Sequence, residues 1–402
     1  PAVAMGCAHP GVAADAAEHQ EVVEKHPTRD FHEKYMLLDR LGAGGFGVVY
    51  SAIQVDTDTD SPPVAVKVID LRQDALRDSA IQGVVGISET DIARKRAARA
   101  EVTTMQALQG CERVCHAHDI FIDGCLAYIV LEKCEMSLYH ALDRLPLLSE
   151  AAVRPFIKGM LRGISFVHAR LIVHRDIKPA NFMYSGNTVK LCDFGLARRV
   201  RTVGDIFRGP CGTPAYMAPE MLLDLPYGQK IDIWALGVSL YAICYGRFPF
   251  AAKHTVAAMT EAVGTGGAEP VFHQEECVIS VPFTLWLRKL MFRDANIRPT
   301  AVDAINECPR HPGLRFNLRS RLESARRCGA FGEVSDKGRL GVVDKRLREL
   351  QRRHHAPSKE SHHPSEAPTD LPDSTPSPAG DTGASNEIAA PAAAAGAGQE
   401  TT

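Results

Sequence analysis

The sequence lacks an excess of charge of either sign, a long apolar run and a disulfide-like cysteine pattern. Its 46 Lys and Arg residues nearly balance 48 Asp and Glu residues, for a formal net charge of −2. Composition therefore gives no reason to expect a nucleic-acid or membrane partner. The alanine-rich residues 1–20 have no basic beginning and no continuous apolar stretch, which argues against a secretory signal or a membrane span.

The 11 cysteines are scattered along a chain of 402 residues, which is too long to need covalent staples. We therefore expect reduced thiols and an intracellular location, in the cytoplasm, the nucleus or both. No internal repeat is visible, so a solenoid or a propeller is not expected.

Residues 354–402 contain no Phe, Trp or Tyr and are rich in Pro, Ala, Ser and Gly. Such a low-complexity tail cannot bury enough apolar surface to fold. Residues 1–33 are small and polar and are predicted to be disordered as well.

Between these ends, residues 34–312 change in a definite order that predicts one domain of the α+β class with two lobes. Short strand-like runs such as "GVVYSAIQ", "VAVKVID" and "AYIVLE" predict a β-rich lobe over 34–132. Longer helical patterns such as "AAVRPFIKGMLRGISFVHARL" predict a mainly helical lobe over 135–312. Residues 313–353 are interpreted as a basic, partly helical extension.

The stretch "LGAGGFGVVYSA" places Gly42, Gly44 and Gly47 between two predicted strands. Glycines there let the backbone approach a phosphate chain and turn its N–H groups toward the oxygens. A plain glycine-rich hairpin is the alternative. A dinucleotide-binding fold needs a helix after the glycines, whereas "VVYSAIQV" is strand-like. The pattern favours a strand–loop–strand cover over phosphates.

Lys67 lies within the apolar strand run "PVAVKVID". An isolated lysine of this kind usually extends its ammonium to solvent. Downstream, Glu101, Met105 and Leu108 share helical spacing, so Glu101 offers a carboxylate on a helix face that packs. Glu89 is a rival partner, but the residues after it form a more polar face. We predict an ion pair between Lys67 and Glu101.

Several motifs stand in one order downstream: "HRDIKPAN" at 174–181, "DFG" at 193–195, "APE" at 218–220, "DIWALGV" at 232–238 and a late Arg298. Together with the glycine loop and "VAVK", they resemble a eukaryotic-type protein kinase over about residues 35–312. Lys178 in "HRDIKPAN" and Thr213 in "GTPAYMAPE" are typical of the Ser/Thr type. Two departures stand out: the stretch 70–100 is long, and the segment after Glu132 is short.

The resemblance implies phosphoryl transfer from ATP to Ser or Thr hydroxyls of protein substrates. Asp176 would act as the catalytic base, with Lys178 near the transferred phosphate. Lys67 and Glu101 would complete the catalytic set, and Asn181 and Asp193 would hold Mg²⁺. The residues implied to contact the nucleotide are Leu41, Gly42, Ala43, Gly44, Gly45, Phe46, Gly47, Val49, Ala65, Lys67, Leu131, Glu132, Cys134, Asn181, Met183 and Asp193.

Other positions implied by the resemblance are architectural. Glu220 would pair with Arg298, Asp232 would tie a helix start to the catalytic loop, and His174 would pack beneath the metal-binding turn. Arg175 would be available to the activation segment. In that segment, between Asp193 and Gly212, the one hydroxyl residue is Thr202.

Three further motifs have competing interpretations. "DTDTDS" from Asp56 begins like a calcium loop but lacks its glycine and its final Glu, so a turn is preferred. "CERVCHAH", residues 111–118, offers soft ligands, but its spacing fits packing better than zinc. The basic helix predicted over 339–353 is either a solvated helix on the large lobe or a regulatory helix for the kinase groove or an acidic partner such as calmodulin.

Two function classes follow: an active Ser/Thr kinase, or a catalytically weak kinase fold that serves as a scaffold or allosteric partner. The active-site residue types are all present, which favours the enzyme.

Overall fold

The computed structural model describes residues 31–44, 47–55, 61–71, 89–123, 125–200, 206–250, 254–264, 269–272, 279–309 and 318–332. The chain divides into two units, residues 1–355 and 356–402, and the described residues all belong to the first. Among the described helices, none combines the length and the apolar character needed to cross a bilayer.

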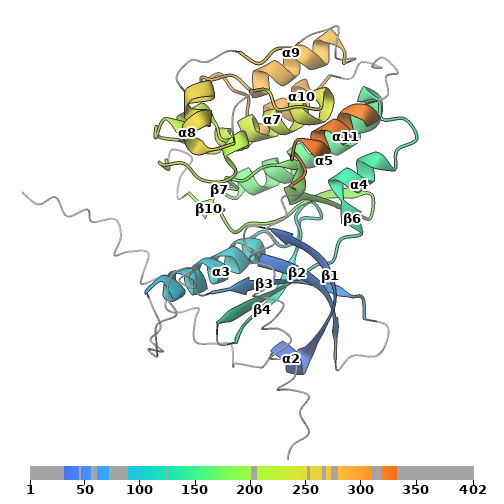
Figure 1. The fold of residues 1–402 in the computed structure, drawn as a ribbon, viewed down its shortest axis with the longest axis vertical. Helices are drawn as coiled ribbons and strands as arrows, with labels where there is room; N and C mark the ends of the chain where they lie inside the picture. Colours follow the sequence, from blue (N-terminus) through green and yellow to red (C-terminus); the bar gives the residue numbers. More distant parts are fainter. Residues whose placement is uncertain are drawn as a thin grey trace, which may run out of the picture. The chain divides into compact units, whose positions relative to one another are not determined.

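The N-terminal lobe is built on a five-stranded antiparallel sheet with strand order β1-β2-β3-β5-β4. Its strands are β1 (Tyr35–Gly44), β2 (Gly47–Gln54), β3 (Val64–Asp70), β4 (Ala117–Asp123) and β5 (Leu126–Leu131). β-branched and aromatic residues recur in these strands, as expected for a pleated surface that is largely buried. Helix α3 (Glu89–Ala107) lies along this sheet, as Figure 1 shows.

The C-terminal lobe is mainly helical (Figure 1). Its helices are α4 (Leu138–Asp143), α5 (Glu150–Ala169), α6 (Pro219–Leu222), α7 (Lys230–Tyr245), α8 (Val256–Met259), α9 (Val281–Leu290), α10 (Ala301–Glu307) and α11 (Arg319–Arg327). Short strands complete it: β6 (Met136–Ser137), β7 (Ile172–Val173), β8 (Phe182–Ser185), β9 (Thr188–Leu191) and β10 (Arg198–Arg199). The α+β class with strands first and helices after is confirmed.

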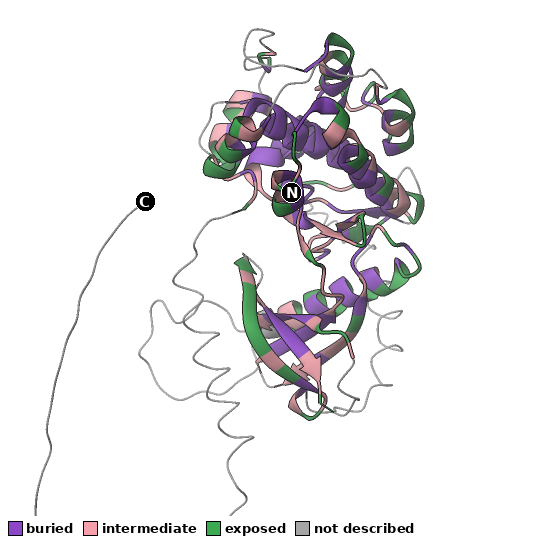
Figure 2. Cartoon of the chain, turned by 90° about the vertical axis from the view of Figure 1, so that its right-hand side faces the viewer, coloured by how far each residue is buried: buried purple, intermediate pink, exposed green. Residues whose placement is uncertain are grey.

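Helix α7 forms the centre of the helical lobe. It is apolar around its whole circumference, and every residue from Ile231 to Tyr245 is buried. Figure 2 shows the buried residues concentrated in the central helices of this lobe. The helix ends at Gly246, which adopts the left-handed conformation with φ 71° and donates its N–H to the Ala242 carbonyl at 2.8 Å.

The core continues from the helical lobe into the face of α3. Met105 of α3 and Leu108, which directly follows this helix, are fully buried with Ile129 of β5. The predicted packing face of this helix is therefore present, and it places Glu101 one turn before Met105 on the same side. This packing decides where the carboxylate points.

Folded structure begins earlier than the sequence indicated. The predicted disordered segment ended at residue 33, but α2 (Phe31–Lys34) packs on the sheet. Phe31 is completely buried and stacks on Tyr128 with 4.2 Å between ring centroids. The Phe31 ring packs into the core of the N-terminal lobe. The polar residues around Phe31 in the sequence do not indicate this packing.

The extension after the helical lobe contains α11, which packs on α7 and α4. Ala325 and Ala330 are buried against Ala242 of α7. The predicted basic helix over 339–353, the low-complexity tail and the rest of the predicted N-terminal segment lie outside the described residues.

Candidate active site

The motif "HRDIKPAN" forms the loop between β7 and β8, and Asp176 is buried at its centre. Its carboxylate accepts hydrogen bonds from Lys178 Nζ at 2.7 Å and from Thr213, through N at 3.0 Å and Oγ1 at 2.8 Å. Lys178 Nζ also donates to Thr213 Oγ1 at 2.9 Å. Residues 37 positions apart thus fix the direction of one carboxylate.

Asn181 closes the same loop from its other end. Its amide nitrogen donates to the Asp176 carbonyl at 2.8 Å and approaches the carboxylate at 3.3 Å. Because the amide nitrogen is directed at Asp176, the amide oxygen points the other way and could coordinate a cation.

The loop is held from below by Asp232 of α7. Its carboxylate accepts the backbone N–H groups of His174 and Arg175, both at 2.9 Å, and the Nε2–H of His168 at 2.8 Å. Burial raises the pKa of Asp232, but these hydrogen bonds and the nearby imidazoles outweigh burial and leave the pKa lowered. The ionised carboxylate holds Arg175 in a left-handed conformation with φ 66°.

His174 joins this loop to the "DFG" segment. Its Nε2–H donates to the Cys192 carbonyl at 3.0 Å, and its ring packs edge-on against Phe194 at 4.9 Å. Asp193 lies between Cys192 and Phe194 with φ 63°. His174 thus lies beneath this turn, where the resemblance to kinases implied it.

Lys67 of β3 donates to Glu101 Oε1 and to Asp193 Oδ1, each at 2.7 Å. Burial lowers the pKa of Lys67, but the two carboxylates outweigh it and the net pKa is raised. Burial also raises the pKa of Asp193, but the Lys67 ammonium outweighs burial and leaves this pKa lowered, so Asp193 is ionised. The choice of Glu101 over Glu89 as the partner of Lys67 agrees with this contact.

The glycine-rich stretch spans the end of β1 and the start of β2, where Gly42 pairs with Val49 and Gly44 with Gly47. Gly47 has φ +152°, and a Cβ there would lie 2.4 Å from the Val68 carbonyl oxygen. This glycine is therefore required for close approach of β3 as well. A Cβ at Gly42 would meet nothing within 4 Å, and Gly45 and Phe46 lie outside the described residues.

The remaining residues predicted to contact the nucleotide lie on β1, β2, β3 and β8 and at or just after the end of β5. Val49 pairs with Lys67, and Ala65 pairs with Leu131. Glu132 donates its N–H to the His116 carbonyl at 2.9 Å and forms an ion pair with Lys190 at 2.6 Å. Leu41 and Ala43 lie exposed on β1, and Met183 is half-buried on β8 beside Ser137.

Asn181 and Asp193 fit a hard divalent cation, because both present oxygen donors and Asp193 is ionised. In the part of the chain that the structure describes, no three His, Cys, Asp or Glu residues are grouped so as to hold a metal ion. A Mg²⁺ ion here would need further oxygens, which the phosphates of ATP supply. The soft ligands of residues 111–118 are likewise not gathered around one point.

The comparisons with known proteins agree with this geometry. Residues 35–309 match the family model described as the protein kinase domain. The chain belongs to the protein kinase family. It is 30% identical to serine/threonine-protein kinase TIO of Arabidopsis thaliana over 269 residues, 67% of this chain and 18% of that protein.

Two other similar kinase relatives have different names and coverage. CDPK-related kinase 8 of Arabidopsis thaliana is 30% identical over 298 residues, 72% of this chain and 45% of its own length. Inactive serine/threonine-protein kinase PLK5 of Mus musculus is 44% identical over 139 residues, 34% of this chain and 23% of its own length. The chain thus spans less than half the length of these three relatives.

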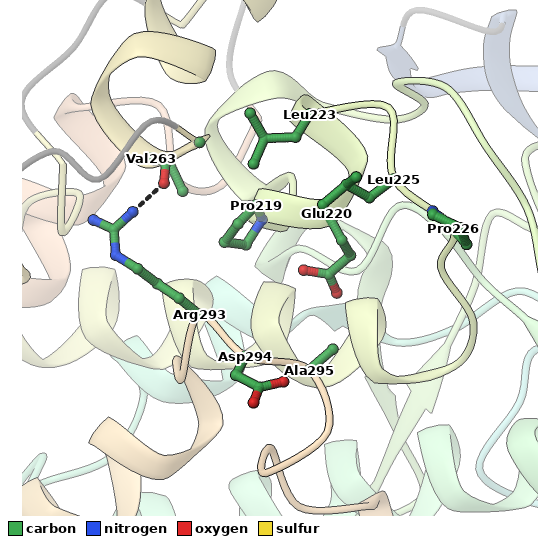
Figure 3. Close-up of a pocket in the computed structure, with 10 residues that line it drawn as sticks. Pro219, Glu220, Leu223, Leu225, Pro226, Val263, Arg293, Asp294 and Ala295 are labelled. Atoms are coloured by element: carbon green, nitrogen blue, oxygen red, sulfur yellow. Dashed lines mark hydrogen bonds between the residues drawn. The ribbon is translucent and has the colours of Figure 1, made fainter.

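The pair predicted between Glu220 and Arg298 is present in the structure. The two side chains make hydrogen bonds of 2.7 and 3.1 Å, and Arg298 is 1% exposed. Glu220 also lines a cavity of about 460 Å³ together with Leu223, Leu225 and Arg293. Figure 3 draws these side chains. Arg293 donates to the carbonyl of Val263, another lining residue. None of its lining residues belongs to the predicted site.

Sequence reasoning missed two contacts of this kinase site. Thr213 was used only as a marker of kinase type, although it binds both Asp176 and Lys178. Cys134 was assigned to the nucleotide site, but its contact with Cys115 at 3.5 Å was not anticipated. The order of the motifs "HRDIKPAN" and "GTPAYMAPE" could have indicated the contact of Thr213. No sequence signal indicates the second.

Proposed function

We propose that this kinase domain transfers the γ-phosphoryl group of ATP to Ser or Thr hydroxyls of protein substrates. The observation that carries the proposal is the orientation of Asp176, whose carboxylate is held between Lys178, Asn181 and Thr213. Phosphoryl transfer asks the protein mainly for positioning and charge neutralisation, and a rigidly held carboxylate suits the first task.

Each residue of the set has a separate task in this proposal. Asp176 orients the acceptor hydroxyl and takes its proton, and Lys178 stabilises charge on the transferred phosphate. Asn181 and Asp193 hold Mg²⁺, which neutralises phosphate charge when bound. Lys67, fixed by Glu101, positions the nucleotide phosphates.

The nucleotide is proposed to lie between the lobes. Ala65 and Val49 would contact the adenine from the small lobe and Met183 from the large lobe, and backbone groups from Glu132 to Cys134 would bind its edge. The Glu132 N–H is bonded to His116, which leaves the Glu132 carbonyl as the acceptor on that residue. The glycine loop would cover the phosphates.

A second function has one observation in its favour: a relative with 44% identity over 139 residues is named as an inactive kinase. A catalytically weak fold could serve as a scaffold or an allosteric partner. This chain keeps Lys67, Asp176, Asn181 and Asp193, and their mutual contacts support the enzyme instead.

The deciding experiment is an assay with radiolabelled ATP on a degenerate peptide library, comparing the wild type with Asp193→Ala. We expect Ser/Thr phosphorylation by the wild type only. Label transfer by neither protein, with nucleotide binding intact, would support the scaffold. Equal transfer by both would indicate a contaminating kinase.

We also propose a regulatory role for the residues after α11. A Cβ added at Gly332 would lie 2.9 Å from Ala180 of the catalytic loop, and Tyr216 Oη donates to the Ala330 carbonyl at 2.9 Å. The described region therefore ends beside Ala180 of the catalytic loop, which is the loop that a protein substrate must approach.

The predicted basic helix over 339–353 follows shortly after Gly332 and would suit an acidic regulatory protein. The test measures binding of Ca²⁺–calmodulin, as a representative acidic partner, to the full chain and to a chain ended at Gly332. Binding to the full chain alone is expected, and equal binding to both would refute the assignment.

No disulfide links the nine cysteines of the described residues, which supports the proposal of an intracellular setting.

A further inference from the structure

Two cysteines meet at the edge of the proposed nucleotide site without a role in the proposed transfer. Cys134 follows the end of β5, and Cys115 lies in the turn before β4. Their sulfur atoms are 3.5 Å apart, although 19 positions separate the residues.

The backbone on both sides of this contact is fixed by hydrogen bonds. Cys115 donates its N–H to the Leu191 carbonyl at 2.9 Å, and the neighbouring strands pair Ala117 with Leu131. A disulfide needs a sulfur–sulfur distance of about 2.05 Å. The two sulfurs must therefore approach by roughly 1.5 Å, a movement that side-chain rotation and a small displacement of the segment after β5 can supply.

The two thiols differ in access and in acidity. Cys115 is 3% exposed, whereas Cys134 is only half-buried, so a dissolved reagent reaches Cys134 first. The hydrogen bond from Cys115 lowers the pKa of Cys134, against the opposing effects of burial and of Glu132. Hydrogen bonds to Cys134 and Cys192, together with burial, raise the pKa of Cys115. An acidic accessible thiol beside a buried one is the arrangement of an attacking and a resolving cysteine.

We propose that Cys134 and Cys115 form an oxidation site for hydrogen peroxide, with Cys134 as the attacking thiol and Cys115 as the resolving thiol. The Cys134 thiolate attacks one peroxide oxygen and the O–O bond breaks, which gives a sulfenic acid and hydroxide. The Cys115 sulfur then attacks the Cys134 sulfur, the S–O bond breaks and the hydroxyl group leaves as water. In total, two thiols and one peroxide give one disulfide and two waters.

The disulfide ties the segment after β5 to the turn before β4. Because backbone groups from Glu132 to Cys134 are proposed to bind adenine, oxidation should weaken nucleotide binding. This consequence rests on the proposed function, whereas formation of the disulfide does not. Cys192 is the nearest competing thiol, but its Sγ donates to the Asn181 carbonyl at 3.2 Å.

The experiment treats the reduced full-length chain with increasing hydrogen peroxide, blocks remaining thiols and digests with trypsin. Cleavage after Arg113, Lys133 and Arg144 places the two cysteines on separate peptides, 114–133 and 134–144. We expect these peptides to be joined in a product that dithiothreitol separates. Fragment masses must assign the link to Cys115, because Cys125 shares the first peptide.

Two variants sharpen the assignment. Cys125→Ser is the matched control and should keep the link. Cys115→Ser should lose it and leave a sulfenic acid at Cys134, which a 1,3-diketone reagent captures. A disulfide from Cys134 to Cys192 would overturn the pair. The pair would also be overturned if Cys134 and Cys115 of the wild type were still reduced at a peroxide concentration that fully oxidises Cys134 in Cys115→Ser.

Binding of Mg·ATP is measured on the same samples. We expect a several-fold loss of affinity on oxidation of the wild type and recovery with dithiothreitol. Complete formation of the disulfide with unchanged affinity for Mg·ATP would refute both the effect of oxidation on nucleotide binding and the placing of Cys134 in the nucleotide site. The oxidation site itself would still be supported.

Discussion

At the scale of single residues, substitutions should separate the proposed role of Asp176 from that of Asp193, a proposed ligand of Mg²⁺. Asp176→Asn should keep ATP binding but reduce phosphoryl transfer by several orders of magnitude, because the acceptor hydroxyl loses its proton acceptor. Asp193→Ala should instead weaken Mg·ATP binding. Nucleotide titrations with and without Mg²⁺, combined with single-turnover kinetics, distinguish the two effects. Near-normal turnover in Asp176→Asn would disprove its role.

The partner of Lys67 is a second question at this scale. Glu101→Gln should lower activity much more than Glu89→Gln, because Glu101 Oε1 lies 2.7 Å from the Lys67 ammonium. Burial raises the pKa of Glu101, and the attraction of Lys67 offsets this effect only in part. Glu101→Gln would leave the buried Lys67 ammonium with one carboxylate partner fewer, so the position of this ammonium should be less well fixed. Steady-state kinetics of the two variants decide the matter, and a larger loss from Glu89→Gln would reverse the assignment.

At the scale of elements, Asp232 joins α7 to the catalytic loop. A carboxyl group with a lowered folded pKa stabilises the fold above its unfolded pKa of about 4, and that contribution is lost as the pH falls through the folded value. Asp232→Asn should therefore destabilise the protein at neutral pH, and the difference from wild type should shrink as the pH falls below about 4. Chemical denaturation across this range measures it; a pH-independent difference would contradict it.

The activation segment is the second element with a prediction. Thr202 lies outside the described residues, but Arg175 already has partners: Nε donates to the Leu196 carbonyl at 2.8 Å, and the guanidinium lies 5.3 Å from the Phe207 ring. Leu196 and Phe207, on either side of residues 201–205, thus contact Arg175 without a phosphate. Bacterially expressed protein stripped by phosphatase should keep most of its activity, and Thr202→Ala should change little. Collapse of activity, restored on rephosphorylation of Thr202, would show a switch there.

At the scale of the whole molecule, the docking of α11 on α7 can be tested with two glycines. Gly246 and Gly329 both have positive φ, 71° and 87°. A Cβ at Gly246 would lie 2.8 Å from Ser324 Cβ of α11, whereas one at Gly329 would meet nothing within 4 Å. Gly246→Ala should lower the free energy of unfolding by about 1–3 kcal/mol more than Gly329→Ala. Equal losses in urea denaturation would show that α11 does not dock there.

The order of motifs was enough to predict the fold class and the family. Strand patterns precede helical patterns, and "HRDIKPAN", "DFG" and "APE" follow a glycine loop at the expected places. Local periodicity also located the packing face of α3, and with it Glu101. These features are readable because each depends on residues close together in the chain.

Contacts between distant segments were decided by the tertiary structure alone. The burial of Phe31 against Tyr128, the bond from Tyr216 to Ala330 and the meeting of Cys115 with Cys134 join residues with no shared periodicity. The sequence by itself determined which chemical groups the protein carries and in what order. Only folding determined which of them meet, because side-chain contacts across a core depend on how whole elements pack.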